Sequence, residues 1–506
     1  MSRRRRILRW ALWVLVVIAL VDLSRRLVLS RSLYDLNLAV GAHLDPLPSP
    51  REGDRLVIFA PHPDDETLGT GGLIQQAVAA GAHVAVVVLT NGEFSEYSVI
   101  LSEKTMRRSP QQFIRLGYAR QQETLAALRY QGLAPSHVTF LGYPNGYLDQ
   151  MWSPAHWSRS RPVTSARTRT AFSPYDNSLT PRAVYCGEAL LEDIRRVLVR
   201  EQPTRVVALH PNDVHLDHWP TGAFVSQALE ELSLAGHAFA RTCPVHSYLI
   251  HRNHWPVPRG YEPWLTMEPP AALMGGETTW FALPLTMAQT IDKHTATREY
   301  KSQGGGIDPL LESFSRATEL YGVMRVRTWR DARTVAPTVV ATDPPRDVDT
   351  AAARPFADIT EVRLSRDDQG LVVELVLRDV PSPRTGYHLS LRGGSARPAD
   401  RVLVELNWRG GRADGIVLRD GALRRVPGDL LGVSQSGRVT RLRAPWPFRA
   451  GAPGYMMVRA WTTGGRRILD RTGLSLLRVM AASPAAGPPA GDSRSAASAQ
   501  RKGSMP

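Results

Sequence analysis

Nearly continuous apolar runs that alternate with helical patterns constrain this fold most. Residues 55–59 and 84–90 carry Val, Leu, Ile, Ala and Phe without polar alternation, and a helical pattern lies between them at 68–80. Strands that are buried on both faces have this composition, and a parallel sheet covered by helices is their usual setting. Further helices are expected at 115–130, 187–200 and 286–302, and further strands at 138–141 and 205–209. The pattern predicts a Rossmann-like, doubly wound, mostly parallel α/β sheet with its site at the carboxyl ends of the strands.

The remaining segments predict a multidomain chain. At 506 residues the chain exceeds one typical core. Short alternating runs with turns such as Arg409-Gly410-Gly411 indicate a C-terminal all-β, sandwich-like domain, and the Ala, Ser, Pro and Gly tail is too poor in apolar residues to fold. We expect an anchor or signal segment at 1–30, a linker at 31–50, the α/β domain at 51–335, a linker at 336–355, the β domain at 356–480 and a disordered tail at 481–506.

An insertion at 148–185 interrupts the α/β pattern. It is rich in Ser, Arg, Thr and Pro. Long insertions in compact domains are often functional lids or disordered segments. A basic lid that faces the substrate is one interpretation of this segment.

The N-terminus combines arginines with an apolar run at residues 10–21. A run of this length fits either the hydrophobic region of a signal peptide or a marginal membrane helix. No small-residue cleavage site follows closely, which favours an uncleaved N-terminal membrane helix. Arginines are denser before the run than after it, so we expect a membrane-anchored protein whose main domains are extracytoplasmic.

Net charge and cysteine content allow several kinds of partner but exclude two kinds of cysteine site. The formal net charge of +15 fits a phosphate-rich or acidic polymer, or a solvated basic surface, and no nucleic-acid partner is predicted. Cys186 and Cys243 are the two cysteines of the chain, which excludes a disulfide scaffold and a cysteine zinc site. Whether they pair, and the oligomeric state, stay open.

Two clusters of acids and histidines carry the chemistry. Pro61-His-Pro-Asp-Asp-Glu66 follows the strand at 55–59, and His210-Pro-Asn-Asp-Val-His-Leu-Asp-His218 follows the strand at 205–209. Charges at buried strand ends are costly unless they are paired or bind a metal. Because parallel strand ends share one crevice, His62, Asp65 and His218 can meet as a metal site with two histidines and one carboxylate. Such a set suits a catalytic zinc that keeps one position for water.

Residues 51–321 resemble the zinc-dependent de-N-acetylases typified by N-acetylglucosaminyl-phosphatidylinositol deacetylase, the PIG-L or LmbE-like proteins. The carriers of this resemblance are the 61–66 motif and His215-Leu-Asp-His218, with lesser support from Arg120 to Glu123, residues 141–146 and residues 301–303. The resemblance implies one Zn²⁺ per chain, bound by His62, Asp65 and His218. Iron or cobalt also suits this ligand set.

The same resemblance assigns roles to the neighbours of these ligands. It implies that Asp64 is the general base and that His215 stabilises or protonates the collapsing intermediate. Arg120 matches a substrate-binding position, and a surface salt bridge is the alternative for it. We expect Asp217, and less strongly Asp213, to orient metal-bound histidines. Asn145 stands where relatives carry Asp, which affects the substrate more than the reaction.

Other residues near the motifs receive plainer interpretations. Gly69, Gly71 and Gly72 lack the spacing of a dinucleotide loop, and the preceding acids would repel a pyrophosphate. His210 is a candidate for lining the site. Five further histidines are expected to be surface or structural residues: His237, His246, His251, His254 and His294.

The expected function is a membrane-anchored zinc hydrolase that removes the acetyl group from an N-acetylated sugar and releases acetate. A glycolipid or an envelope glycan is the expected substrate and partner. One alternative is a zinc amidase that acts on a non-sugar amide. The other is a non-catalytic glycan-binding or scaffold protein, although the presence of both Asp64 and His215 argues against it.

Overall fold

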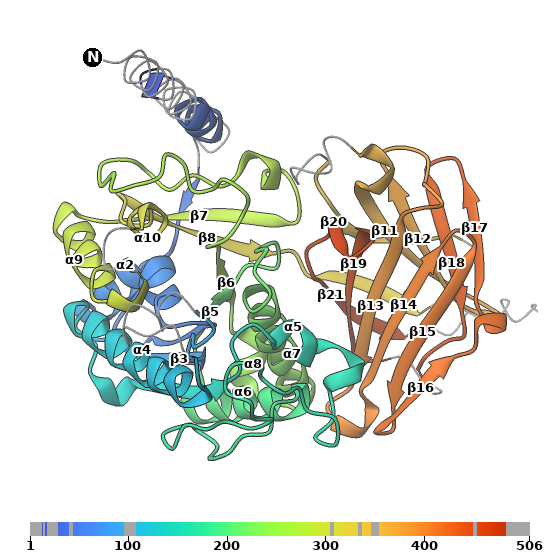
Figure 1. Ribbon diagram of the computed structural model, residues 1–506, viewed down its shortest axis with the longest axis horizontal. Coiled ribbons are helices and arrows are strands. Elements are labelled where there is room, and N and C mark those ends of the chain that lie inside the picture. The colour runs from blue at the N-terminus through green and yellow to red at the C-terminus, as the bar shows by residue number, and fades with distance from the viewer. Residues whose placement is uncertain are drawn as a thin grey trace, which may run out of the picture.

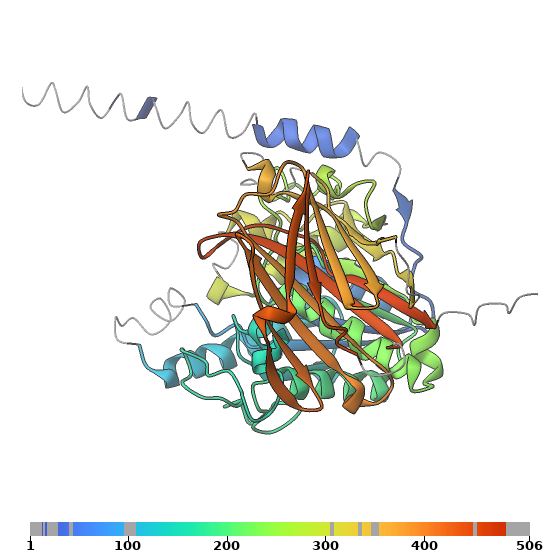
Figure 2. The same cartoon turned by 90° about the vertical axis from the view of Figure 1, so that its right-hand side faces the viewer.

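A computed structural model describes most of the chain. It covers residues 13, 16–17, 29–39, 44–95, 108–303, 308–331, 336–345, 354–448 and 453–481. Residues 29–39 form a helix, which lies at the top of Figure 2 above the rest of the molecule.

The N-terminal part is built on one mixed sheet. In the described residues it has eight strands in the order β1-β7-β8-β6-β5-β2-β3-β4. These strands are β1 (Asp45–Pro46), β2 (Arg55–Ala60), β3 (His83–Thr90), β4 (Val138–Tyr143), β5 (Arg205–Leu209), β6 (Val245–Tyr248), β7 (Thr278–Pro284) and β8 (Thr318–Met324). Strands β6, β5, β2, β3 and β4 run parallel, and β8 pairs antiparallel with β6 and β7. The expected α/β sheet domain is confirmed, and its sheet is mixed, because β8 runs antiparallel to its two neighbours.

Helices cover both faces of this sheet (Figure 1). After β1, the described residues form the α-helices α2 (Asp65–Ala79), α4 (Pro110–Tyr130), α5 (Leu148–Trp152), α6 (Gly187–Glu201), α7 (His218–Leu234), α8 (Ala238–Thr242), α9 (Met287–Thr297) and α10 (Pro309–Glu312). Alternate residues of β2 explain the two layers. Val57 and Phe59 share a core with α6 and α7, whereas Leu56 and Ile58 share a second core with α2. Both faces are therefore apolar, as the continuous runs predict.

The C-terminal part consists of two sheets that enclose one core. One has the order β10-β11-β12-β18-β17 and the other β16-β15-β14-β13-β19-β21-β9 in the described residues, with β20 paired to β19. Their bounds are β9 (Arg327–Asp331), β10 (Thr338–Thr342), β11 (Ile359–Asp367), β12 (Gly370–Leu377), β13 (Gly386–Gly394), β14 (Val402–Arg409), β15 (Arg412–Arg419), β16 (Ala422–Val426), β17 (Gly432–Ser436), β18 (Val439–Ala444), β19 (Tyr455–Gly464), β20 (Arg467–Arg471) and β21 (Ser475–Ala481). Val362 and Leu375 of the first sheet share this core with Leu389 and Val404 of the second.

Turn chemistry explains one of the C-terminal hairpins. Gly410 and Gly411, with φ of 54° and 81°, connect β14 to β15. Two consecutive positive φ values match the right-handed twist of the flanking strands, and glycine adopts them without a steric penalty. The expected turn at these residues is present.

The domain limits stay a prediction. β9 and β10 precede residue 356, yet β9 pairs with β21 and β10 pairs with β11. The insertion at 148–185 contributes the buried Trp152 and Trp157 to the core around α6 and α7. The expected tail at 481–506 lies outside the described residues except for Ala481.

The expected localisation is contradicted. Within the part of the chain that the structure describes, no helix is both long enough and apolar enough to cross a membrane. This finding overturns the membrane-anchored, extracytoplasmic assignment and leaves the membrane partner without support. The predicted membrane helix at residues 10–21 lies outside the described residues, except for residues 13, 16 and 17.

Candidate metal centre and active site

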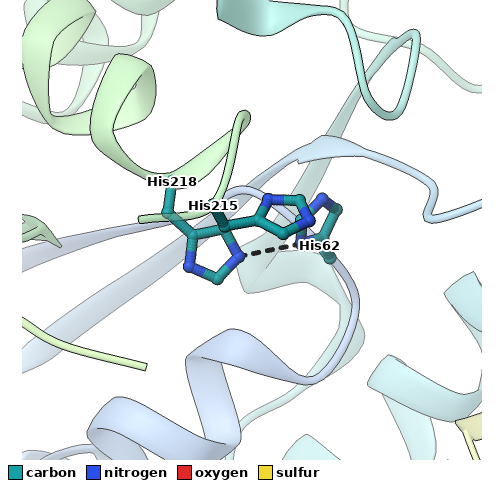
Figure 3. Close-up of side chains that lie close together, drawn as sticks. All are labelled: His62, His215 and His218. Carbon is teal, nitrogen blue, oxygen red and sulfur yellow. Dashed lines mark hydrogen bonds between the residues drawn. The ribbon is translucent and has the colours of Figure 1, made fainter. Parts of the chain in front are cut away.

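The two sequence clusters meet at the carboxyl ends of adjacent strands. β2 and β5 pair in parallel, so the segment after Ala60 lies beside the segment after Leu209. The first segment leads into α2, which begins at Asp65, and the second leads into α7, which begins at His218. Figure 3 shows the rings of His62, His215 and His218 gathered at this point.

Three side-chain atoms form a nearly equilateral triangle. His62 Nδ1 lies 3.0 Å from Asp65 Oδ2 and 3.1 Å from His218 Nε2, and His218 Nε2 lies 3.3 Å from Asp65 Oδ2. Ligand atoms at ~2.0 to 2.2 Å from a tetrahedral zinc are separated by about 3.3 to 3.6 Å. A small expansion of the triangle would therefore accommodate such an ion, and these three residues fit the metal that the sequence predicts.

The carboxylates of Asp217 and Asp213 contact the ring nitrogens of His62 and His218 that lie outside the triangle. His62 Nε2 lies 2.9 Å from Asp217 Oδ2, and His218 Nδ1 lies 3.1 Å from Asp213 Oδ2. In each ring one nitrogen is thus occupied by a carboxylate and the other belongs to the triangle. Carboxylates commonly orient metal-binding histidines in this way. The geometry supports the orienting roles expected for Asp217 and Asp213.

Backbone amides fix these carboxylates in turn. Asp217 accepts hydrogen bonds from Gly146 N at 2.6 Å and Leu148 N at 2.9 Å. Asp213 accepts them from Ile250 N at 3.0 Å and His251 N at 2.9 Å. Segments that follow β4 and β6 therefore support the candidate ligands that follow β2 and β5.

His215 offers a second ligand set. The metal-binding atoms of His62, His215 and His218 all lie within 4.8 Å of one another, so these three histidines can also hold an ion. The triangle that contains Asp65 is tighter, with sides of 3.0 to 3.3 Å. We favour the set with Asp65 for this reason. His215 Nδ1 accepts a hydrogen bond from Asp217 N at 3.1 Å, which leaves Nε2 to carry the proton of the neutral ring.

Asp64 sits in a strained turn beside the triangle. Its φ is 124°, a value that a residue other than glycine rarely adopts, and strain of this kind clusters at functional sites. Glu66 accepts a hydrogen bond from Asp64 N at 3.1 Å and another from Tyr300 Oη at 2.6 Å. Glu66, which lies in the first turn of α2, thereby supports the strained backbone.

Arg120 lies beneath the same turn. Its side chain is 4% exposed, which excludes the surface salt bridge considered from the sequence. The guanidinium donates to Gly92 O at 2.5 Å and Pro63 O at 2.8 Å, and it lies 3.4 Å from Asp64 Oδ2. Glu123 accepts instead from Ser302 N and Oγ. In this structure Arg120 ties the strand-end loops together, and its substrate-binding role stays a prediction.

Burial and mutual charge perturb every titratable group of the cluster. Burial lowers the pKa of His62, but hydrogen bonds with Asp217 and Asp65 outweigh burial and raise it to about 10. Burial and the charge of Asp65 raise the pKa of Asp64 to about 8. Burial, followed by the charges of His218 and His62, lowers the pKa of His215 to about 3. His215 is therefore neutral near neutral pH and can donate a hydrogen bond from Nε2 without carrying a charge.

Sequence reasoning missed some neighbours of the site. His251 was expected to be structural or on the surface, yet its ring centroid lies 4.9 Å from that of His218 and 5.4 Å from that of His215. The buried Asn91 and Glu93 follow β3, and Glu93 accepts a hydrogen bond from Asn145 N at 3.2 Å. Asn91, Glu93 and His251 each lie just after the end of a sheet strand. A polar residue at such a position also marks His62 and His218, so this signal could have identified them.

Three other sequence features have a structural outcome. His210 is fully buried: its Nε2 lies 3.0 Å from Thr278 Oγ1 and its ring stacks on Trp280. Gly69 allows α2 to approach β6, because a Cβ at this position would lie 2.1 Å from the Tyr248 ring. Cys186 and Cys243 are both free, so the two cysteines do not pair in this structure.

The fold and site define a mixed α/β protein with a candidate metal centre at the strand ends. Residues 57–229 match the family model of PIG-L, GlcNAc-PI de-N-acetylase. This part of the chain is a PIG-L family domain.

Named relatives match part of this chain. A 1D-myo-inositol 2-acetamido-2-deoxy-alpha-D-glucopyranoside deacetylase of Mycobacterium sp. (strain KMS) is 34% identical over 179 residues, which are 35% of this chain and 50% of that protein. A protein of the same name from Mycolicibacterium smegmatis is 41% identical over 85 residues, 17% of this chain and 28% of that protein. The chain therefore spans about half the length of the first of these relatives.

Solved structures show weaker resemblance. An N,N'-diacetylchitobiose deacetylase from Pyrococcus horikoshii is 18% identical, with a TM-score of 0.33 and coverage of 53% of this chain and 83% of that one. The zinc-inhibited form of a teicoplanin deacetylase is 17% identical, with a TM-score of 0.34 and coverage of 54% and 98%. At these TM-scores the resemblances define neither the fold nor the site of this chain.

Proposed function

We propose that this chain is a zinc-dependent N-deacetylase that hydrolyses the acetamido group of an N-acetylated sugar to acetate and a free amine. One observation carries the proposal. The triangle of His62 Nδ1, Asp65 Oδ2 and His218 Nε2 lies next to two groups suited to proton transfer and hydrogen bonding, Asp64 and His215. The PIG-L domain and the deacetylase names of its relatives support the same reaction.

His62, Asp65 and His218 would hold the ion, with Asp217 and Asp213 fixing the two rings. A zinc ion in this position polarises the acetyl carbonyl and acidifies a water molecule. Histidine nitrogens with one carboxylate oxygen form a donor set that zinc accepts. Asp217 and Asp213 each contact one nitrogen of a ring, so the other nitrogen of that ring is left to bind the ion.

Asp64 is the proposed general base. Its carboxyl group adjoins the proposed ligand Asp65 without belonging to the triangle. The pKa of Asp64 is raised to about 8 without an ion, and a divalent cation in the triangle would favour the charged form, so the carboxylate could take the proton of the attacking water. The water oxygen bonds to the acetyl carbon, and the carbon–nitrogen bond then breaks. Asp64 returns a proton to the leaving amine, while His215 Nε2–H donates a hydrogen bond to the developing negative charge on the former carbonyl oxygen.

We propose that the substrate contains an N-acetylglucosaminyl group. This choice rests on the relatives, whose names describe an acetamido-deoxy-glucopyranoside linked to inositol. A lipid-linked glycan, a polymeric glycan and a small sugar conjugate all contain this group. The experiment below therefore presents all three forms.

The test measures acetate release from these three substrates by zinc-loaded protein, with wild type and Asp64→Asn side by side. We expect wild type to release acetate from at least one of them. Asp64→Asn should lower kcat by a factor of about 10² to 10⁴, because it removes the base and keeps the size of the side chain. It should also retain about one equivalent of zinc, which separates a catalytic defect from loss of the metal.

Asp176→Asn is the matched control, because Asp176 is exposed on the α/β part. Its acetate release should equal that of wild type. Absence of acetate from every N-acetyl sugar with zinc bound would refute the proposed function. Equal kcat in Asp64→Asn and wild type would remove Asp64 as the base.

A further inference from the structure

A cavity lies between the α/β part and the C-terminal sheets. Its volume is about 240 Å³. One wall comes from α7, α8, β6 and the segment after β8, and the other comes from β19, β21 and Leu474 between them. Its lining includes no residue of the candidate metal centre. Ligand pockets occur preferentially at such junctions between domains.

The interior of this cavity is apolar. Leu229 of α7, Met457 of β19 and Leu476 of β21 belong to its lining and to the core that joins the two parts. Burial raises the pKa of the Cys243 thiol, which also lines the cavity, to about 12, so this group is uncharged. Ser226 and Ser247 turn their hydroxyls to the backbone oxygens of Gly222 and Gly322. A hydrocarbon group therefore suits the interior better than a polar one.

The lining also carries positive charge. It includes the exposed Arg241 and Arg325, and Val326 beside Arg325 is 42% exposed, so this side of the cavity reaches the surface. Among the residues that the structure describes, no ion pair joins Arg241 or Arg325 to an acid. Glu230 is the acid of the lining, and it pairs with Arg478 at 2.9 Å. The charge left at the surface side of the cavity is positive.

We propose that this cavity binds a medium-chain fatty-acid anion, with the hydrocarbon inside and the carboxylate at Arg241 and Arg325. An apolar cavity of about 150 Å³ holds one benzene molecule, so 240 Å³ suits a chain of about eight carbons. The site stands independently of the proposed deacetylase activity.

The charge of the chain's own C-terminal segment argues against that segment as the occupant. Residues 482–506 continue from β21, whose residues Leu476 and Arg478 line the cavity. They contain three basic residues and one acidic residue and are dominated by Ala, Ser, Gly and Pro. A basic, weakly apolar segment complements neither the arginines nor the apolar walls.

Equilibrium dialysis of the full chain against radiolabelled octanoate tests the proposal. We expect saturation at one octanoate per chain. Octanol should bind more weakly than octanoate, and octyltrimethylammonium should bind more than tenfold more weakly, because the arginines repel a cation. A saturation curve without preference for the anion would overturn the assignment, as would absence of saturable binding.

Two variants locate the site. Arg241→Ala/Arg325→Ala should weaken octanoate binding at least tenfold and leave octanol binding within about twofold, since both side chains are exposed and the apolar walls stay intact. Ser226→Leu should fill the cavity and weaken both ligands. The control is Arg412→Ala/Arg424→Ala, which removes two exposed arginines of β15 and β16 and should bind octanoate like wild type. Equal losses in the control and in Arg241→Ala/Arg325→Ala would refute the proposed location.

Discussion

At the scale of single residues, the candidate site depends on how two rings are held. Asp217 and Asp213 each occupy one ring nitrogen and are themselves fixed by backbone amides. The free nitrogens of His62 and His218 then face Asp65. This arrangement gives the ligands a fixed orientation before any ion binds, which reduces the ordering that binding requires.

Removing one orienting carboxylate should weaken metal binding. Asp217→Asn keeps the shape of the side chain but loses the negative charge beside His62 Nε2. We expect the dissociation constant for zinc, measured by competition with a chromophoric chelator, to rise by about 10- to 100-fold. Asp176→Asn is again the control. An unchanged zinc affinity in Asp217→Asn would show that the carboxylate does not act through the metal centre.

The sequence indicates these ligands because their types and spacing are unusual. His62 and Asp65 are three residues apart after β2, and His218 lies after β5. Because β2 and β5 are parallel neighbours in the sheet, the topology brings these residues together. Arg120 and His251 could not be placed in the same way. Their positions depend on the packing of α4 and on the loop after β6, and neither follows from a local pattern.

At the scale of secondary-structure elements, close packing of α2 on the sheet positions Asp65. Tyr248 of β6 lies against Gly69 of α2, and its hydroxyl donates to Phe59 O of β2 at 3.0 Å. The ring is therefore held at both ends. The glycine therefore allows the helix to approach the sheet directly after the candidate metal-binding motif.

A methyl group at Gly69 should destabilise the protein. Alanine has the higher helix propensity by about 1 kcal/mol, which would favour the change. A Cβ placed 2.1 Å from the Tyr248 ring should outweigh that gain, and overpacking costs about 1 to 3 kcal/mol. Urea denaturation should therefore show a net loss for Gly69→Ala.

The control for Gly69→Ala is Gly276→Ala, a substitution outside the helix. Gly276 is exposed and has no atom near the position of a Cβ, so its substitution should leave the free energy of unfolding unchanged or slightly higher. A stabilised Gly69→Ala would mean that helix propensity decides at this position and that the contact with Tyr248 is loose.

Long apolar runs made the central strands and helices predictable, whereas short strands were missed. β2, β3 and β5 lie within one residue of their expected limits. β6, β7 and β8 mix polar and apolar residues, so they lack the continuous apolar runs that predicted the central strands. In the C-terminal part, β15, β16 and β18 each carry two arginines and β17 is mostly polar, so their strand pattern is weak in the sequence.

At the scale of the whole molecule, side chains of the C-terminal sheets form hydrogen bonds with the α/β part. Glu231 of α7 is fully buried and accepts two hydrogen bonds from Arg401 at 2.7 Å and one from Tyr455 at 2.9 Å. Arg471 donates to Val214 O at 3.1 Å, within the loop that carries His215. Such contacts between distant segments cannot be derived from local sequence patterns.

Stability should depend on pH through Glu231. Burial raises the pKa of this carboxyl, but hydrogen bonding and the charge of Arg401 outweigh burial and lower it below its usual value. A lowered pKa contributes stability that is complete above the unfolded value of about 4.5 and is lost as the pH falls through the folded value. Glu231→Gln should therefore cost about 3 kcal/mol at pH 7, and this difference from wild type should shrink below about pH 4.5.

Urea denaturation of both proteins between pH 7 and pH 3.5 measures this difference. Glu192→Gln is the control, because Glu192 pairs with Arg159 on the surface and should change stability by less than about 1 kcal/mol at any of these pH values. A difference between Glu231→Gln and wild type that stays constant with pH would show that the folded pKa of Glu231 is not lowered.

The crystal structure of the zinc-loaded protein, with anomalous scattering at the zinc edge, tests the central claim most directly. The account predicts one ion per chain, bonded to His62 Nδ1, Asp65 Oδ2 and His218 Nε2 at about 2.0 to 2.2 Å, with His215 outside bonding distance. An ion bonded to all three histidines and not to Asp65 would contradict it, as would the absence of an ion at this position.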